Sequence, residues 1–309
     1  MFEPSYIKAH KTGKLSDSIE KAYKILEKCR LCPRECEVNR LKDEEGVCHT
    51  GKSAIVSSHN PHFGEESPLV GTGGSGTIFM TGCNLLCVFC QNWEVSHLGI
   101  GSEVDSKTVA GMMLDLQSEG CHNINFVTPS HVIPQILDAL PYAIEGGLHV
   151  PLVYNTGGYD AVESLKLLEG IFDIYMPDFK FWDPQMAGKY LKAPDYPEKA
   201  REAITEMRRQ VGDLVMDENG IAFRGILLRH LVMPGGVTGT REIMRYIVKE
   251  ISPDTYVNIM DQYRPCGNAG KYPPLDRGIS RDEYEDALTA TREEGIRRLD
   301  KQDHLFRIR

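Results

Sequence analysis

Beyond residue 75, short apolar runs alternate with longer segments whose apolar positions recur every three or four residues. The short runs predict buried strands at 77–81, 124–128, 151–155, 172–177, 225–233 and 255–260. The longer segments predict helices at 107–119, 132–145, 160–168, 197–211 and 240–251, and a charged surface helix at 280–299. This alternation predicts an α/β fold, a partial (β/α)6 barrel of parallel strands with its chemistry at the C-terminal strand ends.

The N-terminal part of the chain has a different pattern. Residues 16–29 predict a short helix, whereas 29–70 are rich in Cys, Gly, Pro and His and show no sustained periodicity. Such a segment needs a metal, or docking onto the main domain, to become ordered. We therefore expect an N-terminal Cys-rich metal-binding extension over 1–75, followed by the parallel-stranded domain and its C-terminal helix over 76–309. Within that domain, Ser106 is the expected N-cap of the helix 107–119.

Composition and charge restrict the possible partners. Of the 309 residues, 41% are hydrophobic and 26% charged, which is ordinary for a globular protein. A formal net charge of −9 argues against broad contact with nucleic acid. The sequence shows neither a signal-peptide pattern nor an apolar stretch of membrane-spanning length, so we expect a cytoplasmic protein that does not bind a membrane. In that compartment the nine cysteines are better explained as metal ligands than as disulfides.

The strongest chemical signal is a loop that carries Cys83, Cys87 and Cys90 directly after the first expected strand. Three thiolates can hold three irons of a 4Fe–4S cluster and leave the fourth iron open to another ligand, whereas an electron-storage cluster normally has four protein ligands. The alternative is a zinc site that borrows a fourth ligand from elsewhere, such as His97.

The spacing of these cysteines, with the aromatic Phe89 just before the last, resembles the radical SAM superfamily. That resemblance implies a 4Fe–4S cluster whose open iron binds S-adenosylmethionine. It further implies reductive cleavage of S-adenosylmethionine to a 5′-deoxyadenosyl radical that abstracts hydrogen, an oxidoreductase activity. Such a reaction needs an electron donor, for which flavodoxin or ferredoxin is the expected kind of partner.

The same resemblance implies cofactor contacts at other strand ends, from Phe89 in the loop and from Thr128, Ser130, Asn155, Asp178, Lys180, Arg229 and His230. Asp178-Phe179-Lys180 is similar to an Asp-x-Lys of glycyl-radical activating enzymes. Thr128-Pro129-Ser130 departs from the Gly-Gly-Glu stretch of related enzymes, so hydroxyls or backbone carbonyls would have to replace it. Each residue also has an ordinary structural explanation, such as a turn or an ion pair at a strand end.

A narrower resemblance is to uncharacterised radical SAM proteins that are similar to pyruvate formate-lyase activating enzyme. It rests on short stretches spread over nearly the whole chain, at 29–34, 126–131, 154–159, 175–180 and 229–232. It implies a fold and a cofactor but hardly a substrate, since function does not follow from fold.

A second metal signal comes from Cys29, Cys32, Cys36 and Cys48, with spacing C-x2-C-x3-C-x11-C. Four thiolates close either a zinc site or an auxiliary iron–sulfur cluster, and spacing does not separate the two; of these we lean slightly to zinc. The nearby histidines (His49, His59 and His62) are more often exposed loop residues than ligands.

Catalytic residues beyond the cofactor are not identified by the sequence. Cys266 and Tyr263, in a loop after the sixth expected strand, are weak candidates, and Cys121 reads as a buried small hydrophobe. We consider hydrogen abstraction from a protein partner of glycyl-radical type first, and a small metabolite bound by the loops 180–197 and 261–277 second. A non-catalytic iron–sulfur or zinc protein is the alternative from another class. The substrate, the oligomeric state and the fate of S-adenosylmethionine stay open.

Overall fold

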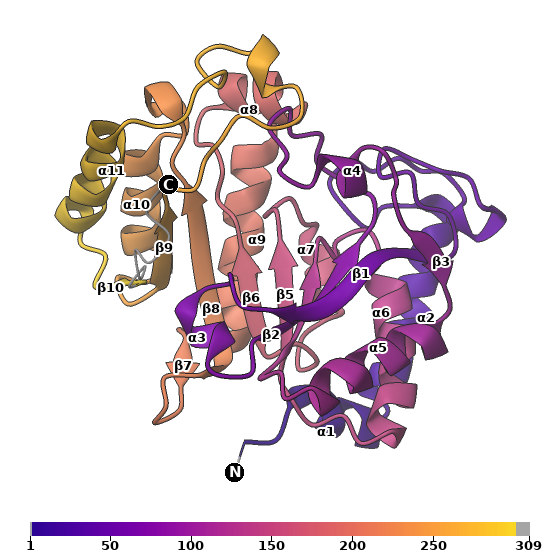
Figure 1. The fold of residues 1–309 in the computed structure, drawn as a ribbon. Helices are drawn as coiled ribbons and strands as arrows, with labels where there is room; N and C mark the ends of the chain where they lie inside the picture. The colour runs from indigo at the N-terminus through magenta and orange to yellow at the C-terminus, as the bar shows by residue number, and fades with distance from the viewer. Residues whose placement is uncertain (1, 301–309) are drawn as a thin grey trace.

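A computed structural model describes residues 2–300 of the chain. Within these residues, a ten-stranded mixed sheet forms the centre of the molecule, in the order β10-β9-β8-β6-β5-β4-β2-β1-β3, with β7 pairing with β8 at one side (Figure 1). Six neighbouring strands are parallel, and their order across the sheet is the same as their order along the chain. They are β2 (Ser75–Met80), β4 (Ile124–Val127), β5 (Leu152–Thr156), β6 (Ile174–Pro177), β8 (Ala222–Leu231) and β9 (Tyr256–Met260). The predicted α/β class with a parallel sheet is therefore confirmed.

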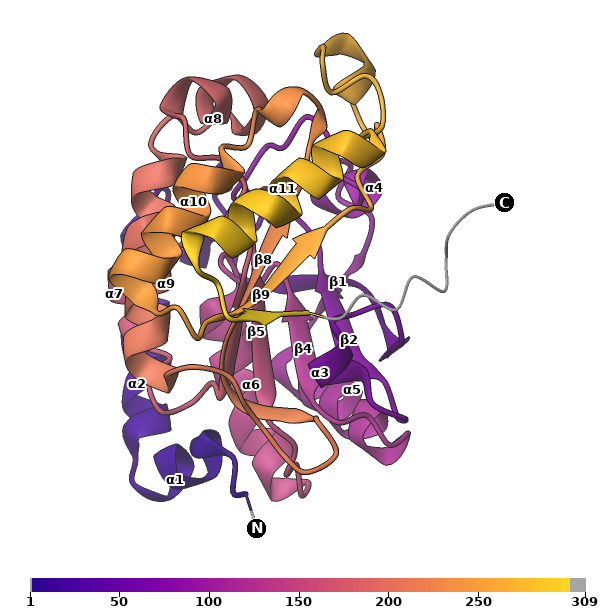
Figure 2. The same cartoon turned by 90° about the vertical axis from the view of Figure 1, so that its left-hand side faces the viewer.

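The central strands are buried on both faces, which explains their continuous apolar runs. Every residue of β5 and β6 is buried. The principal helices are α5 (Ser106–Ser118), α6 (Ile133–Glu145), α7 (Val162–Lys166), α9 (Tyr196–Val211), α10 (Thr240–Tyr246) and α11 (Arg281–Glu294). Of these, α5 packs on β2 and β4, α9 packs on β6 and β8, and α10 packs beside α11 (Figure 2). The arrows of β5, β6 and β8 point to one end of the molecule in Figure 1, where α4 (Trp93–Ser96) and α8 (Pro184–Leu191) lie.

The N-terminal segment joins the same sheet, which the sequence pattern did not predict. Strand β1 (Ala54–His62) pairs antiparallel with β2, and β3 (Ser102–Val104) pairs with β1. The alternation of apolar and polar residues in β1 is not evident in the sequence. A register shift between Val56 and Ser58 interrupts it, and the second half of the strand is polar and partly exposed. Docking onto the sheet thus orders this part of the segment. The expected domain boundary near residue 75 falls at the start of β2, and the division into two domains stays a prediction.

Several smaller elements complete the described chain. They are α1 (Ser5–Lys11), α2 (Lys14–Ile25), α3 (Ser67–Val70), β7 (Val215–Met216), β10 (Arg298–Leu299), the 3-10 turns Leu26–Lys28, Arg40–Lys42, Pro234–Gly236 and Ala269–Lys271, and a π turn Ile247–Ile251 after α10. None of the described helices combines the length and apolar character that crossing a bilayer requires.

Two helix ends differ from the prediction. The N-cap of α5 is Asp105 rather than Ser106, because a carboxylate oxygen of Asp105 accepts from the backbone N–H of Thr108 at 2.8 Å. Ser106 is the first helical residue and donates instead to Asp138. The expected helix 280–299 ends early, since Gly295 adopts a left-handed conformation (φ +102°) after α11 and the chain continues into β10.

Candidate metal and cofactor site

A cavity of about 330 Å³ opens at the carboxyl ends of the parallel strands. That is the position where ligands bind in open α/β sheets, and its size suits a small-molecule site. Residues from most of the strand ends meet there, among them Met80, Thr128, Asn155, Asp178, Arg229 and Met260. The loop after β2 supplies all three cysteines of the predicted cluster site, Cys83, Cys87 and Cys90.

The three-cysteine loop is held by backbone hydrogen bonds to other segments. Val88 donates to the carbonyl of Tyr190 in α8 at 2.9 Å, and the carbonyl of Val88 accepts from the N–H of Asn268 at 2.8 Å. Cys87 is buried, while Cys83 and Cys90 are half-buried. The loop is thus fixed between α8 and the segment after β9, with its thiols facing the cavity.

The surroundings of these thiols fit a bound iron–sulfur cluster. The N–H of Leu85 donates to the sulfur of Cys83 at 3.3 Å, and the hydroxyl of Ser96 donates to the sulfur of Cys90 at 3.1 Å. Burial raises the pKa of Cys83 to about 12 and also raises that of Cys87, although the charge of Lys180 opposes both shifts. Free thiolates are therefore costly here, and metal coordination would supply the compensation.

A buried charge network forms the polar side of the cavity. Arg229 donates from Nε to Asp178 and from Nη2 to the side-chain oxygen of Asn155, both at 2.7 Å. Lys180 donates from Nζ to the other carboxylate oxygen of Asp178. Burial works to raise the pKa of Asp178, but the positive charges of Arg229 and Lys180 outweigh it and hold the pKa below its ordinary value. The structure thus brings these residues together at the strand ends.

Two glutamates in the cavity were missed by the sequence analysis. Glu65 and Glu66, which lie between β1 and α3, approach Nη1 of Arg229 at 3.6 and 3.8 Å. Burial raises the pKa of Glu66 to about 7, although the charge of Arg229 opposes the shift. One carboxylate oxygen of Glu66 accepts from the amide of Asn258 at 3.1 Å, and among the described residues the other oxygen has no hydrogen-bond partner. The sequence analysis would have predicted these residues at the site only if it had identified β1 as a strand of the sheet.

Phe89 and Thr128 lie in the cavity wall. Phe89 makes edge contacts with the rings of Phe181 and Tyr263, at centroid distances of 6.0 and 6.2 Å. Thr128 has a positive φ of 62°, and its N–H donates to the carbonyl of Asn155 at 2.8 Å. Gly157, after β5, also lines the cavity and leaves room for a ligand to approach the backbone.

Other predicted contacts lie away from the cavity lining. His230 is buried, with Nδ1 bonded to the carbonyl of Phe179 and Nε2 to the hydroxyl of Thr240. Ser130 bonds to the hydroxyl of Thr156 at 3.1 Å, and the hydroxyl of Tyr263 donates to the carbonyl of Leu275 at 2.6 Å. Cys266 is half-buried in the loop after β9 and does not line the cavity. The structure therefore does not bring these four residues to the cofactor cavity.

The histidines considered as ligands have other surroundings. His97 stacks on Trp93 at a centroid distance of 3.8 Å and bonds to Ser96. His49 and His59 lie 3.8 and 4.0 Å from Glu45 and Asp115. His62 lines the cofactor cavity and accepts from the N–H of Gly64.

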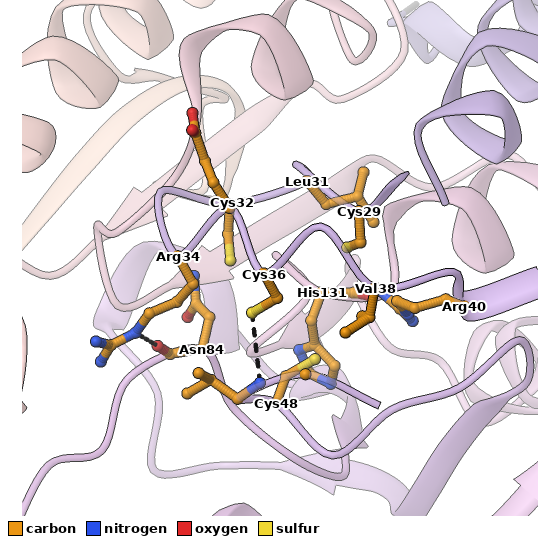
Figure 3. A pocket seen from close by; sticks show the side chains of 13 residues that line it. Cys29, Leu31, Cys32, Arg34, Cys36, Val38, Arg40, Cys48, Asn84 and His131 are labelled. Carbon is orange, nitrogen blue, oxygen red and sulfur yellow. Dashed lines mark hydrogen bonds between the residues drawn. The ribbon is translucent and has the colours of Figure 1, made fainter. Parts of the chain in front are cut away.

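A second, smaller cavity is lined by the four N-terminal cysteines. Figure 3 shows Cys29, Cys32, Cys36 and Cys48 around one space, with Asn84 and His131 also in its wall. Burial raises the pKa of Cys32 to about 12, and the other three thiols raise it further by smaller amounts. Burial also raises the pKa of Cys48.

Among residues 2–300, no three His, Cys, Asp or Glu side chains are arranged to hold a single metal ion. Four thiolates around one Zn²⁺ at about 2.3 Å would lie within roughly 4 Å of one another. The four cysteines line one cavity, and whether they bind zinc or an auxiliary iron–sulfur cluster stays a prediction.

No known protein-family profile matches the chain. Over 287 residues, the chain is 32% identical to the "Uncharacterized protein MJ0674" of Methanocaldococcus jannaschii, an alignment that covers 90% of this chain and 78% of the archaeal protein. Among solved structures, it is similar to one described as "Native anSMEcpe with bound AdoMet", with 11% identity and a TM-score of 0.46. That superposition covers 71% of this chain and 61% of the other, so the chain spans less than two thirds of that protein.

Proposed function

This chain belongs to the same family as the M. jannaschii protein MJ0674, and because that relative carries no assigned activity, we propose a function from the site itself. We propose that the protein is a radical SAM enzyme, in which Cys83, Cys87 and Cys90 hold a 4Fe–4S cluster. When bound, this cluster would supply the electron that cleaves S-adenosylmethionine to methionine and a 5′-deoxyadenosyl radical, an oxidoreductase chemistry.

The observation that carries the proposal is the ligand set of the cofactor cavity. Among the described residues that line it, the cysteines are Cys83, Cys87 and Cys90, and no fourth thiol accompanies them. Three thiolates leave one iron of a 4Fe–4S cluster without a protein ligand. That iron would face a cavity whose other walls carry the charged groups of Asp178, Lys180 and Arg229. A cluster meant only for electron storage would not need this open, charged space.

The remaining lining residues suit a ligand with the functional groups of S-adenosylmethionine. Its carboxylate would pair with a cation, Lys180 or Arg229, and its amino group would donate to the carbonyl or hydroxyl of Thr128; all three residues line the cavity. The ring of Phe89 and the open backbone at Gly157 offer apolar and stacking contact for the adenosine part. Ser130 and His230 are not part of this proposal, because neither lines the cavity.

The finer parts of the proposal concern architecture, substrate and partners. The chain-order sequence of six parallel strands, with helices packed against them, favours a partial (β/α)6 barrel carrying an N-terminal Cys-rich extension. Hydrogen abstraction from a protein substrate of glycyl-radical type is the first hypothesis, and a small metabolite is the second. A flavodoxin or ferredoxin would donate the electron, and the number of unpaired thiols favours the reducing cytoplasm.

The test is reductive cleavage of S-adenosylmethionine by anaerobically reconstituted protein. Wild-type protein with dithionite should release 5′-deoxyadenosine, and Cys87→Ala should release none above background. Cys121→Ala is the matched control, because Cys121 is buried next to β4 and lines neither cavity. Cleavage that survives in Cys87→Ala would overturn the assignment of the cluster.

A further inference from the structure

We propose that Cys29, Cys32, Cys36 and Cys48 bind a second iron–sulfur cluster, of the 4Fe–4S class, which is separated from the first by the short stretch Gly82–Asn84. The part of this inference that concerns the neighbouring cluster rests on the proposed function. The N-terminal site itself stands on its own residues.

The ligand set is complete within the second cavity. All four cysteines line it, together with the apolar residues Leu31, Val38 and Val47. Four thiolates close the coordination of a 4Fe–4S cluster and leave no iron for a substrate. This is the opposite of the three-cysteine site, whose lining leaves one position open.

The loop backbone supplies hydrogen bonds to these sulfurs, as iron–sulfur proteins do to set cluster stability and potential. The N–H of Val47 donates to the sulfur of Cys36 at 3.5 Å. The backbone N–H groups of Arg34 and Thr50 donate to the sulfurs of Cys32 and Cys48. At Gly46 a Cβ would lie 2.7 Å from the sulfur of Cys36, so the backbone itself closes over this thiol.

A cluster and a zinc ion place different demands on the four thiols. Sulfurs bound to one Zn²⁺ converge on a sphere of about 2.3 Å radius. Sulfurs bound to different corners of an iron–sulfur cube stay farther apart, since each binds its own iron. Either would use the four thiolate ligands that the site offers, so the metal content of the purified protein decides between them.

The two sites share a wall. Asn84 lines the N-terminal cavity, while its neighbours Cys83 and Leu85 line the cofactor cavity. Asn84 is fixed from both sides: its amide donates to the carbonyl of Tyr159 at 2.5 Å, and its carbonyl accepts from Nε of Arg34 at 2.9 Å. A Cβ on Gly82, the residue before Cys83, would lie 2.4 Å from the carbonyl oxygen of Cys48.

Thr81, the residue before Gly82–Asn84, also contacts a residue of the N-terminal cavity. The ring of His131 bonds to the carbonyl of Thr81 at 2.8 Å, and the carbonyl of His131 accepts from Arg40 at 2.7 Å. His131 and Arg40 both line the N-terminal cavity. Two clusters held in this way would be close neighbours in a fixed orientation, so their unpaired spins should interact when both are reduced.

The first experiment measures iron, acid-labile sulfide and zinc in the anaerobically purified full-length protein, because the metal content of the wild type alone separates the alternatives. We expect about eight irons per chain, since each cluster holds about four. Cys36→Ser and Cys87→Ala should each reduce this to about four, and Cys121→Ala should leave it unchanged. About four irons with one zinc, the zinc lost in Cys36→Ser, would overturn the second cluster and leave the proposed function intact.

The same experiment also distinguishes failure of the proposed function from failure of the second cluster. If Cys36→Ser lost about four irons and Cys87→Ala lost none, the proposed function would fail and the N-terminal cluster would stand. Electron paramagnetic resonance of the dithionite-reduced proteins tests the shared wall without any activity. The wild-type spectrum should be broadened by spin coupling that is absent from both single-cluster variants. A wild-type spectrum equal to the sum of the two variant spectra would overturn the proposed proximity.

Discussion

Gly82 and Cys48 lie so close that a Cβ on Gly82 would come within 2.4 Å of the carbonyl oxygen of Cys48. Gly82 also has a positive φ of 85°, which an L side chain rarely adopts. These two residues form one contact between the loop after β2 and the N-terminal cysteine segment, and the hydrogen bond from Arg34 to Asn84 forms another. The absence of a side chain at Gly82 is therefore what allows the two metal-binding segments to meet.

Gly82→Ala should separate the two segments. The left-handed backbone alone costs about 1–2 kcal/mol for a residue with a Cβ, and the collision with the carbonyl of Cys48 adds to it. We expect a lower melting temperature and weaker retention of iron, measured by circular dichroism and metal analysis. Gly220→Ala is the matched control, because Gly220 has a φ of 79° and nothing within 4 Å of its Cβ position. Equal losses in the two variants would argue that the contact with Cys48 is unimportant.

Removal of Arg229 should be strongly destabilising. Its guanidinium is buried against Asp178, and loss of one partner from a buried ion pair costs about 3–5 kcal/mol, because the other charge is left uncompensated. We expect Arg229→Ala to lose this much in denaturant titration and to lose binding of S-adenosylmethionine. Arg281→Ala, which removes an exposed pair with Glu285, should change stability little. A small effect at Arg229 would contradict the buried network.

Glu66 should make the stability of the protein depend on pH. Burial raises its pKa in the folded protein to about 7 from an ordinary value of 4.5, so the folded state binds a proton that the unfolded state releases in this range. Its contribution to stability is therefore full below pH 4.5 and falls as the pH rises through about 7, with a slope of at most about 1.4 kcal/mol per pH unit.

Glu66→Gln should remove this component, because a glutamine stays neutral at every pH in the range. The comparison is of unfolding free energies of variant and wild type between pH 5 and pH 8, an interval of about three units chosen to span the shift. The groups that face Glu66 are Glu65, Arg229 and Asn258, and all three are kept. Glu163→Gln, at an exposed position, serves as the control. Parallel pH profiles for Glu66→Gln and the wild type would refute the burial effect.

Ser96 should influence the reduction potential of the proposed three-cysteine cluster. Its hydroxyl donates to the sulfur of Cys90 at 3.1 Å, and hydrogen bonds to ligand sulfur stabilise the more negative, reduced state. Ser96→Ala should keep the iron content and shift the potential to a more negative value in a spectroscopic redox titration. Ser118→Ala, whose hydroxyl bonds only to the carbonyl of Asp115 in α5, should leave it unchanged. An unaltered potential in Ser96→Ala would show that this hydrogen bond does not reach the cluster.

The sequence by itself determined the six parallel strands and the groups of cysteines. Both are local signals: apolar runs reveal strands that are buried on both faces, and ligand spacing within a loop does not depend on the rest of the fold. The sequence also placed Asn155, Asp178 and Arg229 at strand ends, and ends of parallel strands meet at one edge of a sheet.

Only the tertiary structure decided which side chains reach the cavity. Arg229 and His230 are adjacent in β8 and so point to opposite faces. Arg229 lines the cavity, whereas His230 bonds to the carbonyl of Phe179 and the hydroxyl of Thr240, and which of the two reaches the cavity depends on how the sheet is covered. Glu66 reaches the site because β1 pairs with β2, and Cys48 meets Gly82 because the N-terminal segment docks against the loop. These contacts join residues far apart in the chain, and no local pattern encodes such pairing.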